Sequence, residues 1–132
     1  MNFGFIPTTW SPYLLSVLRI VAALEFLQHG TAKYLKFPVV PAYAGFAPLS
    51  PAGVAGFFEL NGGLFLLVGL FSRFWAFFMS GVMAVAYFMA HAPRGFFPIL
   101  NMGELAILYC FVFLYLAAAG PGPWSIDAKF KK

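Results

Sequence analysis

Four long apolar stretches constrain the fold of this chain more than any other feature. A transmembrane α-helix needs about 20 mainly apolar residues to cross a bilayer. Pro12, Pro51 and Pro98 stand at the starts of three stretches, where a missing backbone N–H costs a helix least. The expected spans cover residues 12–32, 51–71, 74–91 and 98–119. The sequence therefore predicts an all-α, integral membrane four-helix bundle, formed by a single domain over residues 1–132.

The composition agrees with a membrane protein and excludes an ordinary soluble domain. Hydrophobic residues make up 62% of the chain and charged residues only 9%, whereas soluble domains carry about 25% charged residues. A nucleic-acid-binding surface requires a basic patch on a soluble fold. We therefore expect the lipid bilayer, and no nucleic acid, as a partner.

Four spans place both termini on the same side of the membrane. Residues 33–50 are expected to form an interfacial loop that either covers a site or simply connects two helices, and residues 120–132 a tail. The side with the termini holds Arg73, Lys129, Lys131 and Lys132, and the opposite side holds Lys33, Lys36 and Arg94. The side with the termini thus has one more positively charged residue than the opposite side. Under the positive-inside rule, this difference and the lysine cluster of the tail predict that both termini are cytoplasmic.

Three of the four acidic residues lie inside the expected spans, where charges are rare. An ionised side chain in hydrocarbon costs roughly 3 kcal/mol on insertion scales, so it normally faces the bundle interior and has a partner. From the helical rise, Glu25 and Glu59 lie about 12 Å, and Glu104 about 9 Å, below the surface opposite the termini. The three carboxyls are therefore expected at nearly one depth, in the outer half of the bundle.

Further polar residues are expected at the same end. Glu25, His29 and Lys33 follow one another at intervals of four and share one helix face. The sequence therefore predicts that these polar residues form one site, in which some residues transfer protons and others bind a cofactor. The candidates for catalytic proton transfer are Glu25, Glu59, Glu104 and His91, and those for cofactor binding are His29, Lys33, Tyr87, Arg94 and Asn101.

Arg19 belongs to a different region of the first span. It lies nearer the side of the termini, and its face is turned about 120° from that of Glu25. It either extends to the near interface or pairs with a group there. Asp127 is the acid available on that side, so an Arg19–Asp127 pair that docks the tail is predicted.

Short motifs occur in each span and in the tail. They are Leu18-Arg19-Ile20, His29-Gly30 and Lys33; Glu59, Gly62-Gly63 and Gly69; His91; Asn101-Met102-Gly103-Glu104-Leu105-Ala106; and Gly120-Pro121-Gly122-Pro123-Trp124-Ser125-Ile126-Asp127. Together they resemble the DoxX family of small four-helix membrane proteins, whose closing motif is G-x-G-x-x-S-[LI]-D. The resemblance covers nearly the whole chain, and the Asn-x-Gly-Glu element with the tail is its most specific part.

The resemblance implies a multi-pass protein of a bacterial or archaeal cytoplasmic membrane. Some family members are small subunits of a thiosulfate:quinone oxidoreductase, and others accompany redox or stress-response enzymes. A quinone is therefore the cofactor that we expect, with no metal or haem. The expected protein partner is a larger membrane complex or further copies of this chain in a homo-oligomer.

Three interpretations of the polar residues remain open. The carboxyls and imidazoles exchange protons with a quinone held by aromatic side chains, in a subunit of an oxidoreductase rather than a stand-alone enzyme. Alternatively, the cations and histidines only neutralise the acids in a structural network. In the third interpretation, the chain is a non-catalytic accessory or assembly subunit. A metal site is less favoured, because di-iron bundles use Glu-x-x-His on two helices, whereas Glu25 and His29 are four residues apart.

Overall fold

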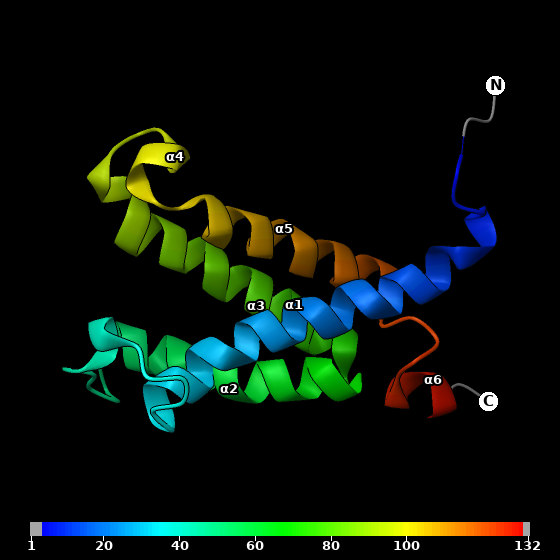
Figure 1. The fold of residues 1–132 in the computed structure, drawn as a ribbon, viewed down its shortest axis with the longest axis horizontal. Helices are drawn as coiled ribbons and strands as arrows, with labels where there is room; N and C mark the ends of the chain where they lie inside the picture. Colours follow the sequence, from blue (N-terminus) through cyan, green and yellow to red (C-terminus); the bar gives the residue numbers. More distant parts are fainter. Residues whose placement is uncertain (1–3, 131–132) are drawn as a thin grey trace.

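The computed structural model describes residues 4–130, which fold into a bundle of helices (Figure 1). The four principal helices are α1 (Ser11–Tyr34), α2 (Pro51–Val68), α3 (Ser72–Ala86) and α5 (Glu104–Ala119). The short elements are η1 (Thr8–Trp10), η2 (Pro41–Tyr43), η3 (Tyr87–His91), η4 (Ala92–Arg94), α4 (Pro98–Asn101) and α6 (Ile126–Phe130). Three helical segments are long and apolar enough to span a membrane, and α5 is shorter. The predicted all-α bundle is confirmed; Lys131, Lys132 and both ends of the predicted domain lie outside the described residues.

The helices pack as two pairs, α1 with α2 and α3 with α5, and α2 contacts α3 between the pairs. The pairs meet at the end that carries α6 and the start of α1, which we call the terminal end (Figure 1). They spread apart toward the loop end, which carries residues 35–50 and α4 (Figure 1). The start of α1 and α6 thus lie on one side, as predicted.

Close backbone contact holds α1 against α2. A Cβ atom on Gly30 of α1 would lie only 2.5 Å from the backbone nitrogen of Leu60 on α2, so only glycine permits this approach. The core between the two pairs is apolar. Phe26 of α1 is buried and meets the ring of Phe113 on α5 edge-on, with ring centroids 5.0 Å apart.

The fourth span differs from the prediction of one continuous helix over residues 98–119. It consists of α4 and α5, separated at Met102, whose φ of 61° is left-handed. The buried side-chain oxygen of Asn101 accepts a hydrogen bond of 2.8 Å from the backbone N–H of Gly103. This local bond competes with helix continuation, as asparagine side chains commonly do. The second span is also shorter than predicted, because Gly69 adopts φ 72° and ends α2 at Val68.

A buried arginine fastens the terminal end. The guanidinium of Arg19 is fully buried and donates hydrogen bonds to the carbonyls of Leu67 (2.7 Å), Pro121 (2.9 Å), Leu66 and Trp124. Carbonyls at the end of a helix lack intrahelical partners, so Arg19 satisfies the end of α2 and holds the tail with the same group. Arg19 is therefore buried against the tail rather than exposed on the surface of the bundle.

Asp127 docks the tail from the opposite direction. Its carboxylate accepts hydrogen bonds of 2.8 Å each from the backbone N–H groups of Phe71 and Ser72, at the start of α3. A carboxylate at a helix N-terminus also interacts favourably with the helix dipole. The predicted involvement of Arg19 and Asp127 in tail docking is thus found, with backbone groups as their hydrogen-bond partners and a favourable electrostatic interaction between the two charges.

Candidate functional site

A buried ion pair joins α1 and α2 near the loop end. The ammonium of Lys33 lies 2.9 and 2.7 Å from the two carboxylate oxygens of Glu59, and both side chains are less than 10% exposed. Gly56 makes room for the lysine, because a Cβ there would lie 2.7 Å from Lys33 Cδ. Each charge therefore has the partner that an ion in hydrocarbon requires.

The loop between α1 and α2 covers this pair with an aromatic ring. Tyr43 of η2 places its ring centroid 5.5 Å from Lys33 Nζ, within the range of a cation–π contact. Its hydroxyl lies 3.4 Å from Nδ1 of His29. Burial, and secondarily the Glu59 carboxylate, raise the pKa of Tyr43, so the phenol stays neutral at physiological pH. Residues 35–50 therefore cover the first polar group, which consists of His29, Lys33, Tyr43 and Glu59.

A second polar group joins the end of the third span to α4. The ring nitrogen Nδ1 of His91 lies 3.1 Å from the carbonyl oxygen of Asn101. Because a carbonyl can only accept, Nδ1 carries the proton. The Asn101 amide donates to the Gly95 carbonyl (2.8 Å) and the Tyr87 hydroxyl (3.4 Å). Tyr87 and His91 stack at 6.3 Å within a π-helical turn, a feature that is frequent at functional sites.

The nine residues predicted to form one site therefore do not form one cluster. His29, Lys33 and Glu59 belong to the first group, and Tyr87, His91 and Asn101 to the second. The remaining three, Glu25, Glu104 and Arg94, are exposed on the surface of the bundle. The prediction of a common depth is compatible with this result, but the inference that the residues meet is wrong. The reason is the divergence of the two helix pairs toward the loop end (Figure 1).

The two exposed glutamates differ in their surroundings. Glu25 accepts a hydrogen bond of 2.8 Å from the Gln28 side chain, one turn further along α1. Glu104 begins α5, and its carboxylate has no hydrogen-bond or ion-pair partner among residues 4–130. In the same part of the chain, no three His, Cys, Asp or Glu side chains come together as a metal site.

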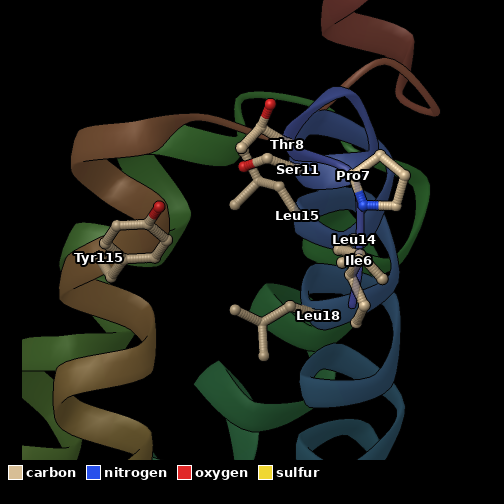
Figure 2. Close-up of a pocket in the computed structure, with 8 residues that line it drawn as sticks. All are labelled: Ile6, Pro7, Thr8, Ser11, Leu14, Leu15, Leu18 and Tyr115. Carbon is tan, nitrogen blue, oxygen red and sulfur yellow. The ribbon is translucent and has the colours of Figure 1, made fainter. Parts of the chain in front are cut away.

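Sequence reasoning missed a pocket between α1 and α5 near the terminal end, shown in Figure 2. It is an open groove of about 470 Å³, and all of its lining residues except Leu15 are exposed. The residues that line it are Ile6, Pro7, Thr8, Ser11, Leu14, Leu15, Leu18 and Tyr115. Tyr115 faces the α1 side chains across the pocket (Figure 2). The sequence did contain one indication of this pocket: Tyr115 places a hydroxyl group within an apolar stretch, and the first span carries several leucines.

Comparisons with known proteins define the class and then the family. Inner membrane protein YqjF of Escherichia coli strain K12 is 32% identical over 88% of this chain and 91% of its own length. An uncharacterized protein of Haemophilus influenzae is 47% identical over 93% of this chain and 95% of its own. With its apolar helices, the chain is a multi-pass protein of the inner, cytoplasmic membrane. The DoxX family profile matches residues 14–92, and the chain belongs to that family. No solved structure is significantly similar.

Proposed function

We propose that this protein is the quinone-binding subunit of a membrane redox system, with the quinone ring in the pocket between α1 and α5. The observation that carries the proposal is the lining of that pocket. Three hydroxyl-bearing residues, Thr8, Ser11 and Tyr115, border a wall of aliphatic side chains, and no carboxylate, amine, guanidinium or imidazole is among the lining residues. This combination suits a neutral, apolar ligand with a few hydrogen-bond acceptors.

The hydroxyl groups match the carbonyl oxygens of a quinone. Those of Thr8, Ser11 and Tyr115 have no hydrogen-bond partner within the described residues, so each is available to donate. An anionic phospholipid headgroup fits less well, because its phosphate calls for a cation such as arginine. Leu14, Leu15 and Leu18 supply an apolar surface for the ring.

One face of α1 leads from the pocket to Glu25. Leu14, Leu18, Val21 and Glu25 follow at helical intervals of four, three and four residues, so they share that face. Glu25 lies about 10 Å along the helix from Leu18. Ser11 lies about 21 Å along the helix from Glu25, so Glu25 is beyond hydrogen-bond reach of a quinone oxygen held in the pocket. In this proposal the protons come from water at the exposed terminal end, whereas Glu59 and His91 have internal partners and support the helices.

The redox chemistry calls for a partner. A quinone accepts two electrons and two protons when it becomes a quinol, and the aliphatic and hydroxyl side chains of the pocket supply no electrons. The electrons therefore come from a larger redox enzyme with which this chain is associated. This requirement fits a subunit rather than a stand-alone oxidoreductase.

The Tyr115→Phe variant tests the pocket. Removing one neutral hydrogen bond is worth about 1 kcal/mol, so quinone retention should fall about fivefold. The measurement is the quinone extracted per chain after purification from native membranes in a mild detergent. Tyr13→Phe is the matched control, because Tyr13 is on α1 outside the pocket and packs against Trp124. Equal quinone content in the two variants and the wild type would count against the proposal, as would its absence from all three.

An accessory or assembly role is the second candidate function. It is favoured by the internal satisfaction of the two polar groups and by exposed aromatic residues on α3, including Phe74 and Phe77. Co-purification from native membranes distinguishes the two. An accessory subunit brings down a larger enzyme whose activity survives Tyr115→Phe, whereas a quinone-binding subunit brings down one whose quinone-dependent activity falls.

A further inference from the structure

The face of α2 that is turned away from α1 and α3 is open in the part of the chain that the structure describes. Helix α2 runs along one edge of the bundle (Figure 1). Its exposed apolar side chains are Val54, Phe57, Leu64 and Val68, each between 40% and 53% exposed. Together with the partly exposed Asn61, they recur at intervals of three and four residues and form one stripe along the helix. None of the five lines the pocket between α1 and α5.

Asn61 places a side-chain amide within this apolar stripe. It lies about 15 Å along the axis from Pro51 and about 10 Å from Val68, inside a helix that is apolar enough to cross the hydrocarbon. One of its N–H groups donates a hydrogen bond of 2.8 Å to the Phe57 carbonyl. Its Oδ1 accepts no hydrogen bond, and its second N–H donates none, within residues 4–130. Because an amide without partners is strongly disfavoured in hydrocarbon, this side chain calls for a hydrogen-bonding neighbour.

We infer that α2 packs against α2 of a second copy of this chain, with the two Asn61 amides hydrogen-bonded to each other. In a two-fold dimer with its axis along the membrane normal, the two helices are parallel and the same surface meets itself. The free N–H of each Asn61 then donates to Oδ1 of the other copy. Phe57 and Leu64, one turn to either side, pack against their counterparts and shield the amides from lipid.

The chemistry of asparagine suits such a contact. An amide carries both donors and an acceptor, so two identical side chains satisfy each other, which two carboxylates or two ammonium groups cannot do. Asparagine side chains hydrogen-bond across transmembrane helices. A single asparagine in an apolar seam also fixes the register and the number of helices that meet there. Asn61 therefore specifies the second copy, and the apolar stripe supplies the contact area.

Other arrangements fit this stripe less well. Lipid acyl chains offer Asn61 neither a donor nor an acceptor. A helix of another protein needs a polar group at the same depth, whereas a second copy supplies one by symmetry. The exposed face of α1 carries an amide, Gln28, but this amide is bonded to Glu25. Pairing that face with itself would bring two Glu25 carboxyls together, so α1 is the less suitable contact.

Cysteine cross-linking of the full-length protein in native membranes tests which face forms the contact. In a Cys110→Ala background, single cysteines are introduced as Phe57→Cys and Leu64→Cys on the stripe, and as Val21→Cys and Leu24→Cys on the exposed face of α1. A disulfide forms only where two Cα atoms come within about 7 Å. Oxidation with copper phenanthroline should therefore give disulfide-linked dimers at positions 57 and 64, and none above background at positions 21 and 24.

Asn61→Leu tests the hydrogen bonds between the two copies. Self-association of the full-length protein is measured by sedimentation equilibrium in density-matched micelles. Loss of two interhelical hydrogen bonds should weaken the dimer about tenfold, whereas Asn61→Gln, which keeps an amide, should weaken it about twofold at most. Gln28→Leu is the matched control and should change association less than twofold. It removes an exposed amide of α1 at a similar depth, since Gly30 packs against Leu60.

The two assays together decide the inference. The folded state of each variant is verified by its circular dichroism. The inference fails if the wild type is monomeric in both assays, if Asn61→Leu associates like the wild type, or if the α1 positions cross-link as strongly as those of α2. It also fails if Gln28→Leu and Asn61→Leu weaken the dimer equally, or if the α2 cysteines cross-link only to a different protein.

Discussion

Replacement of Arg19 by methionine is expected to destabilise the bundle by about 4 kcal/mol, because each buried carbonyl left without a donor costs about 1–3 kcal/mol. The guanidinium is fully buried and serves carbonyls of α2 and of the tail. The Leu66 carbonyl keeps a second donor, the Gly69 N–H at 3.2 Å, and the bonds to Leu67, Pro121 and Trp124 are only partly buried, so water can replace part of what is lost. The predicted cost therefore corresponds to about two lost partners rather than four.

The measurement is unfolding of the protein in dodecyl maltoside by increasing fractions of sodium dodecyl sulfate, followed by circular dichroism. Arg94→Met is the matched control, since Arg94 is exposed at the end of η4 and should change stability by no more than about 0.5 kcal/mol. Arg19→Lys should recover only part of the loss, because an ammonium cannot reproduce the fork of a guanidinium. Identical unfolding of Arg19→Met and Arg94→Met would contradict the account of the terminal end.

Glu59→Gln should be about as damaging, at about 3–5 kcal/mol, because it leaves the Lys33 ammonium buried without its counter-charge. Lys33→Met should cost a similar amount for the converse reason. The Lys33→Met/Glu59→Leu double variant removes both charges and should regain most of the lost stability, since buried ion pairs can be replaced by apolar side chains at little cost.

A double-mutant cycle on the same unfolding assay checks this prediction. Strong coupling between positions 33 and 59, together with unchanged quinone content in the double variant, identifies the pair as a structural support. Additive losses would show that the two charges do not depend on each other. Loss of quinone in a double variant of normal stability would contradict the structural role and indicate that Glu59 takes part in proton transfer.

The sequence was sufficient to predict the helices, for a physical reason. Helix length and position along the axis follow from the rise per residue, so the placement of Glu59 and Lys33 toward the loop end of the bundle could be anticipated. The direction in which each helix faces its neighbours depends on side-chain packing between distant segments. For that reason, the separation of His91 and Asn101 from Lys33 could not be foreseen.

Two local features were also beyond sequence reasoning. The break at Met102 depends on the buried Asn101 side chain finding the Gly103 N–H, and an asparagine within an apolar stretch does not by itself show that geometry. The pocket between α1 and α5 uses Thr8 and Ser11, which precede the expected first span. Their hydroxyls become informative only when the fold places Tyr115 opposite them (Figure 2).

The most direct measurement is photolabelling of the native protein with an azidoquinone, with labelled positions mapped by mass spectrometry. The proposed function predicts labelling within residues 6–18 and at Tyr115, and protection of both by excess unlabelled quinone. Labelling confined to η2 or α4, or labelling that excess quinone does not reduce, would contradict a quinone site between α1 and α5.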